Sequence, residues 1–173
     1  MKILSFDPGG TTGWAYHELY NGELTGLPMI EGGQIGPHEH HGELWELIYR
    51  RNPDLIVYEQ FDYRLKKDKE TGLEVPGISL ISNEYIGIIK LWGQKMPKCK
   101  LHNQSSSYGG AGGKSRKAFW TDEKLKVIGA HTPGNQHRND ATRHMLMYIT
   151  EGILQRKDYL HMFKPARPTN ANK

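Results

Sequence analysis

The sequence predicts an α/β fold in which a mixed β-sheet is flanked by helices. Short apolar runs of strand length alternate with longer segments whose apolar residues recur at the helical period. The first two strand-like runs are separated by Pro8, Gly9 and Gly10, which is typical of a hairpin. Strands that alternate with helices in this way favour a mixed sheet covered by helices. No internal repeat is visible in the sequence.

The chain opens with the predicted hairpin. Residues 3–7 form an apolar run that ends on Asp7, and residues 12–16 form the returning strand. A carboxylate at the last residue of a buried strand is costly unless a positive group, such as a metal ion, neutralises it. The alternative is that Asp7 only caps the turn through its own side chain. The hairpin alone leaves both interpretations open.

The next segments lead to a second buried strand. Residues 24–30 and 32–35 are weak strand candidates, and residues 43–51 carry apolar side chains at helical spacing. Residues 54–58 then form a continuous apolar run, which is typical of a parallel strand covered on both faces. Like the first strand, this run finishes on a carboxylate, Glu59.

The remaining chain alternates polar segments with helical patterns. Residues 60–77 are charged and are expected to form a mobile loop, and residues 105–113 are rich in Ser and Gly. Three helices and one strand are expected, at residues 78–95, 114–127 and 140–155 for the helices and 98–102 for the strand. We expect one domain over residues 1–160 and a disordered tail over residues 161–173, which is rich in Pro, Asn and Lys.

Composition narrows the class of protein. The 173 residues carry 23 Lys and Arg against 19 Asp and Glu, a net charge of +4 that is compatible with nucleic acid and equally with a solvated basic surface. Cys99 is the single cysteine, which excludes an internal disulfide and a cysteine-based zinc site. No apolar run approaches the roughly 18 residues of a membrane span, and the start shows no signal-peptide pattern. We therefore expect a soluble, cytoplasmic protein with no membrane partner.

Four polar residues form a candidate metal site: Asp7, Glu59, His137 and Asp140. If Asp7 and Glu59 end neighbouring strands, their carboxylates emerge at one edge of the sheet about 5 Å apart. His137 and Asp140 are three residues apart near the start of the last helix and would share one face. Converging acids repel unless divalent cations neutralise them, and an oxygen-rich site suits Mg²⁺ or Mn²⁺ better than zinc.

These residues lie in motifs that resemble a known nuclease family. The stretches FDPGGTTGWA, IVYEQF and HRNDATRHMLMY are together similar to the RuvC-like Holliday junction resolvases, especially the small versions carried by bacteriophages, within the RNase H-like nucleases. The resemblance covers residues 1–156 in the family's order. It implies an RNase H-like mixed sheet of about five strands, the first three antiparallel, with helices on both faces.

The resemblance also implies an activity. A member of this family would be a Mg²⁺-dependent endodeoxyribonuclease that cleaves branched DNA by two-metal hydrolysis and acts as a homodimer. Asp7 would bridge two Mg²⁺ or Mn²⁺ ions, Glu59 would bind one, and His137 with Asp140 would complete the coordination. His144, one turn after Asp140, is an alternative to His137, which is preferred because its spacing matches the family.

The sequence departs from the family at two points. The family uses a lysine near the scissile phosphate, which could be Lys114 or Lys117, and an aromatic wedge, whose expected position is flanked by Phe61 and Tyr63. The aromatics could equally be incidental residues of a solvated loop. The helix at 78–95 is the expected dimer surface. Basic residues expected to hold DNA phosphates are Arg64, Lys66, Lys67, Lys69, Lys114, Arg116 and Lys117.

Other functions remain open from the sequence. A catalytically inactive RNase H-like module could bind DNA or a packaging partner, and a nuclease of the same chemistry could act on flaps, forks or RNA–DNA hybrids. The stretch Gly112-Gly113-Lys114-Ser115 is similar to a Walker A loop, but Tyr108 stands where that pattern requires glycine. We therefore expect no nucleotide cofactor.

Overall fold

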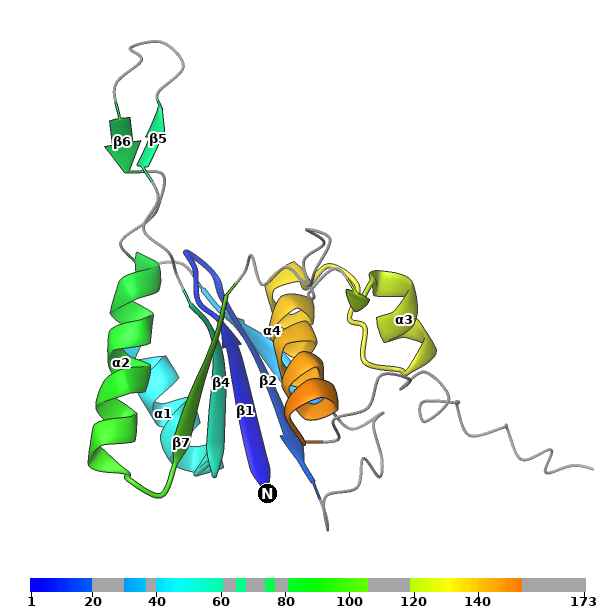
Figure 1. The fold of residues 1–173 in the computed structure, drawn as a ribbon, viewed down its shortest axis with the longest axis horizontal. Helices are drawn as coiled ribbons and strands as arrows, with labels where there is room; N and C mark the ends of the chain where they lie inside the picture. Colours follow the sequence, from blue (N-terminus) through cyan, green and yellow to red (C-terminus); the bar gives the residue numbers. More distant parts are fainter. Residues whose placement is uncertain are drawn as a thin grey trace, which may run out of the picture.

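The computed structural model describes residues 1–19, 30–36, 40–60, 65–67, 74–76, 81–105 and 119–153. A five-stranded sheet lies between helices α1 and α2 on one face and helix α4 on the other (Figure 1). The elements are β1 (Lys2–Asp7), β2 (Thr12–Glu18), β3 (Glu31–Ile35), α1 (His41–Arg51), β4 (Leu55–Gln60), β5 (Leu65–Lys67), β6 (Glu74–Pro76), α2 (Ile81–Lys95), β7 (Lys100–Ser105), α3 (Asp122–Val127), α4 (Gln136–Met147) and the π-helix η3 (Tyr148–Ile153).

The sheet has the strand order β3-β2-β1-β4-β7. The first three strands in the chain pair antiparallel, whereas β4 runs parallel to β1 and β7 runs parallel to β4. This arrangement confirms the predicted mixed sheet with three antiparallel strands first and helices on both faces. Among the described residues, none of the helices has the length and hydropathy that crossing a membrane requires.

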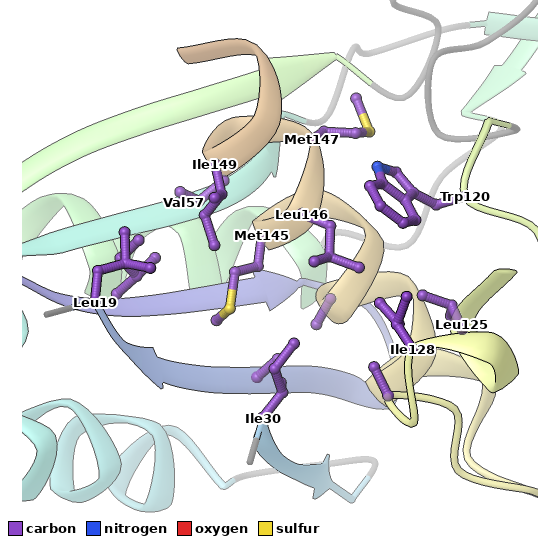
Figure 2. Close-up of a cluster of buried hydrophobic side chains, with 14 of the residues drawn as sticks. Leu19, Ile30, Val57, Trp120, Leu125, Ile128, Met145, Leu146, Met147 and Ile149 are labelled. Atoms are coloured by element: carbon purple, nitrogen blue, oxygen red, sulfur yellow. The ribbon is translucent and has the colours of Figure 1, made fainter. Parts of the chain in front are cut away.

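Alternation along the two central strands divides their side chains between two cores. Leu4 and Phe6 of β1 belong to the core that α1 and α2 cover, while Ile3 of β1 and Val57 of β4 belong to the core on the α4 side. Figure 2 shows this second core, with Trp120, Leu125 and Ile128 packing beside Met145 and Leu146 of α4. Odd-numbered residues at the ends of β1 and β4 therefore face α4.

Helix α4 lies unusually close to the sheet. A Cβ atom added to Gly13 of β2 would collide with the backbone of His137, so glycine is needed where the first turn of α4 crosses this strand. Nearby, the Ser5 hydroxyl donates a 2.5 Å hydrogen bond to the Ala141 carbonyl. These two contacts fix the first two turns of α4 against β1 and β2.

Two segments differ from the predictions. Residues 60–77 were expected to be a loop, but β5 and β6 pair antiparallel within them, with Lys66 opposite Val75. Three-residue strands are too short to show an alternating apolar pattern in a charged segment. Of the helix expected at 114–127, the structure describes α3, which begins at Asp122. The Thr121 hydroxyl caps this helix by accepting a 3.4 Å hydrogen bond from the Lys124 backbone N–H.

Other boundaries shift or lie outside the described residues. The last helix begins at Gln136 instead of 140 and continues as a π-helix from Tyr148, so His137 and Asp140 both lie on α4. The strand expected at 24–30 is described only at Ile30. The Ser/Gly stretch beyond residue 105 and the tail at 161–173 fall outside the described part of the chain.

Replacing Gly87 by alanine is expected to stabilise the protein by about 0.5–1 kcal/mol. Gly87 is exposed in the middle of α2, and an added Cβ would meet no atom within 4 Å, so the change only reduces the entropy of the unfolded chain. Urea unfolding of the two proteins measures the difference. Gly93→Ala on the same helix is the control, because its Cβ would press on Leu101 and cancel the gain. A lower free energy of unfolding for Gly87→Ala would contradict the prediction.

Candidate metal centre

The parallel pairing of β1 and β4 brings two carboxylates to the same edge of the sheet. Phe6 is paired with Tyr58, so the residues that follow, Asp7 and Glu59, lie side by side at the carboxyl ends of the strands. Both are odd-numbered residues, so their side chains lie on the face of the sheet that α4 covers. Each side chain is 13% exposed. Two largely buried carboxylates in such proximity require neutralisation by a positive group.

His144 of α4 completes a group of three possible metal ligands. Its side chain is fully buried, and its Nε2 lies 2.9 Å from Oε2 of Glu59. Ligand atoms of Asp7, Glu59 and His144 all lie within 4.8 Å of one another. On the other side of the ring, Nδ1 lies 2.8 Å from Oε1 of Gln104, the residue of β7 that pairs with Glu59 in the sheet.

His137 contacts Asp7 from the more exposed side of the carboxylate pair. Its Nδ1 lies 3.0 Å from Oδ2 of Asp7, and its side chain is 43% exposed. The backbone N–H of His137 donates to Oε1 of Gln34 at 3.3 Å, which ties the first turn of α4 to β3. The two histidines of α4 therefore flank the carboxylates, with His137 beside Asp7 and His144 beside Glu59.

Asp140 has a different set of contacts. Its carboxylate accepts hydrogen bonds from the Arg143 guanidinium and from Nε2 of Gln136, the latter at 3.2 Å. Arg143 is itself nearly buried, pairs with Asp122 at the start of α3 and donates its Nε–H to the Trp120 carbonyl at 2.7 Å. Among the described residues, neither Asp140 nor His137 belongs to the three-ligand group.

The side chains of the remaining predicted site residues are not described in this structure. Lys66 and Lys67 lie on β5, where the backbone alone is described. Outside the described residues lie Phe61, Tyr63, Arg64, Lys69, Lys114, Arg116 and Lys117. Sequence reasoning missed Gln104 and Arg143. The position of Gln104 could have been found from the strand that precedes it, because parallel strands end at a common edge.

The donor set fits a divalent cation. Carboxylate oxygens are the ligands that Mg²⁺ and Mn²⁺ prefer, and a neutral imidazole nitrogen can join them. Asp7 and Glu59 supply negative charge at a position where little water reaches them, so binding a cation removes the cost of burying both carboxylates together. The residues at this edge are therefore suited to hold such an ion.

A mixed sheet of this order, with carboxylates ending its two central strands and a helix packed across them, defines the RNase H-like class of fold. No protein-family model matches the sequence, and no curated protein matches it either. The structure of T. thermophilus RuvC in complex with Holliday junction substrate is similar, with a TM-score of 0.58 and 15% identity over 89% of this chain and 96% of RuvC.

A viral protein shows the same likeness. The crystal structure of fowlpox virus resolvase with substrate Holliday junction DNA has a TM-score of 0.59 and 15% identity, and the match covers 88% of this chain and 99% of the resolvase. The chain thus has the fold of the RuvC-like Holliday junction resolvases, as its motifs predicted.

Proposed function

We propose that this protein is a divalent-metal-dependent endonuclease that cleaves branched DNA such as four-way junctions. The observation that carries the proposal is the meeting of Asp7, Glu59 and His144 at one edge of the sheet, within 4.8 Å of one another. The fold supports it, because the similar RuvC and fowlpox structures are complexes with Holliday junction DNA.

In the proposed site, Asp7 would help to hold both ions, because its carboxylate lies 3.0 Å from Nδ1 of His137 and within 4.8 Å of ligand atoms of Glu59 and His144. Glu59 would hold one ion, and His137 and Asp140 of α4 would contribute further ligands. Two such ions, when bound, supply an activated water and stabilise the charge on the leaving oxygen of the phosphodiester. Lys114 or Lys117 is proposed to contact the scissile phosphate.

Residues outside this edge are proposed to hold the substrate and a second copy of the chain. Phosphate contacts are assigned to the basic residues near β5 and to those of the segment before α3, with Phe61 or Tyr63 unstacking bases. A homodimer presents one site to each of two equivalent junction strands. We assign its surface to α2, which leaves Leu91 46% exposed and is followed by Met96, 40% exposed.

Cleavage of four DNA shapes tests the proposal. We expect a four-way junction, a flap and a fork to be cut at least about tenfold faster than linear duplex with Mg²⁺ or Mn²⁺, because distorted strands reach an active site at the sheet edge more easily. Initial rates on labelled oligonucleotides measure this. Equal rates on all four would leave a nuclease without shape selectivity. Binding without cleavage of any substrate would favour an inactive DNA-binding module.

A further inference from the structure

His144 lies in a chain of three side chains that crosses the site. Gln104 of β7 and Glu59 of β4 are paired in the sheet, and the His144 ring reaches both of them from α4. The ring is fully buried and Gln104 is 8% exposed, so water has little access to either nitrogen. A ring held in this way has one nitrogen directed at Gln104 and the other at the carboxylates.

The hydrogen-bond partner of Nδ1 determines what Nε2 can do. In the tautomer that carries its proton on Nδ1, this atom donates to Oε1 of Gln104 at 2.8 Å, and Nε2 presents a lone pair. That lone pair faces Oε2 of Glu59 at 2.9 Å. In that tautomer the two lone pairs repel, and a cation beside both atoms would accept them. With the proton on Nε2, the same 2.9 Å contact is a hydrogen bond to Glu59.

The distances match shared coordination of one ion. Two ligands at adjacent positions around an octahedral ion, each about 2.1 Å from it, lie about 3 Å apart. The 2.9 Å separation of Glu59 Oε2 and His144 Nε2 agrees with this spacing. A histidine that binds a metal through one nitrogen usually donates its other N–H to a fixed acceptor. Oε1 of Gln104, 2.8 Å from Nδ1 of His144, is placed to be that acceptor.

We propose that His144, oriented by Gln104, is a direct ligand of the divalent ion that Glu59 binds. This inference rests on the proposed metal-dependent function and adds an imidazole ligand from the third turn of α4, independent of His137. An imidazole nitrogen suits first-row transition ions, whereas Mg²⁺ keeps mostly oxygen ligands. The site therefore binds Mn²⁺ more tightly than Mg²⁺, and His144 is the reason.

Pulsed EPR of Mn²⁺ bound to the full chain, without DNA, tests the proposal directly. The informative variant is His137→Asn, which leaves the buried ring in place and removes the other histidine that contacts the carboxylates. At saturating Mn²⁺ this variant is expected to keep a coupling between the electron spin and a histidine ¹⁴N nucleus. Labelling histidine with ¹⁵N should replace the ¹⁴N coupling pattern with that of a ¹⁵N nucleus. Absence of the coupling in His137→Asn would overturn the proposal.

Two further variants separate a ligand from a purely structural residue. His137→Asn combined with His144→Asn should lose the coupling, since asparagine can still donate to Gln104 and lacks Nε2. Gln104→Ala should keep the coupling but weaken Mn²⁺ binding about tenfold, because the ring loses its orienting acceptor. A parent protein that binds no Mn²⁺ would overturn both this inference and the proposed function. A parent that binds Mn²⁺ without coupling in His137→Asn would overturn this inference alone.

Discussion

Asp7→Asn is expected to reduce the rate of junction cleavage by about 1,000-fold or more while leaving junction binding intact. The Asp7 carboxylate lies 3.0 Å from Nδ1 of His137 and within 4.8 Å of a ligand atom of Glu59, so its replacement removes a negative charge that the proposed ions would use. A loss of about 4 kcal/mol of transition-state stabilisation corresponds to this factor. Single-turnover cleavage with Mg²⁺, together with gel-shift binding in Ca²⁺, measures the two effects separately.

Asp54→Asn is the matched control for Asp7→Asn. Asp54 lies next to the opposite end of the same two strands, where its Oδ2 accepts a 2.7 Å hydrogen bond from the Lys2 backbone N–H. Asparagine removes the charge but keeps an oxygen that can accept this exposed hydrogen bond, so cleavage should stay within about twofold of the parent. If Asp7→Asn cleaved at the parental rate, the proposed catalytic role of Asp7 would be wrong.

Gly13→Ala is expected to lower cleavage about 100-fold and to destabilise the fold by about 1–3 kcal/mol. The added methyl group would occupy the position of the His137 backbone, so the first turn of α4 must move away from β2. That movement carries His137 away from Asp7 and weakens the 2.5 Å hydrogen bond from Ser5 to Ala141. Thermal unfolding and single-turnover cleavage, both done well below the melting temperature, measure the two losses.

Gly42→Ala provides the comparison for Gly13→Ala. Gly42 is exposed on α1, and an added Cβ would meet no atom within 4 Å. This variant should retain parental cleavage and equal or slightly higher stability. Parental activity in Gly13→Ala would mean that the close contact between β2 and α4 does not position the site.

The sheet and its two carboxylates could be predicted because their signals are local. An apolar run that ends on Asp7 and another that ends on Glu59 are visible without knowledge of the fold, and parallel pairing then places both at one edge. The resemblance to RuvC-like resolvases added the number of strands and the antiparallel pairing of the first three, which periodicity alone does not specify. The resulting topology agrees with the structure.

The surroundings of the site were less predictable because they depend on register and packing. The strand expected at 98–102 continues to Ser105, and this extension places Gln104 beside Glu59. The sequence did not single out Arg143, because an arginine in a helical pattern usually lies on the helix surface. Its near burial becomes clear only from its partners in the structure, Asp122 and Asp140. His144 was an alternative ligand by helical spacing, and its burial against Glu59 follows from how α4 crosses the sheet.

Two consecutive residues of α4, Arg143 and His144, contact the described residues on either side of 106–118. His144 contacts Gln104 just before the segment, and Arg143 contacts the Trp120 carbonyl just after it. The same two side chains touch Glu59 and Asp140, respectively. The described residues on the two sides of 106–118 are therefore anchored to one turn of α4, beside the carboxylates of Glu59 and Asp140.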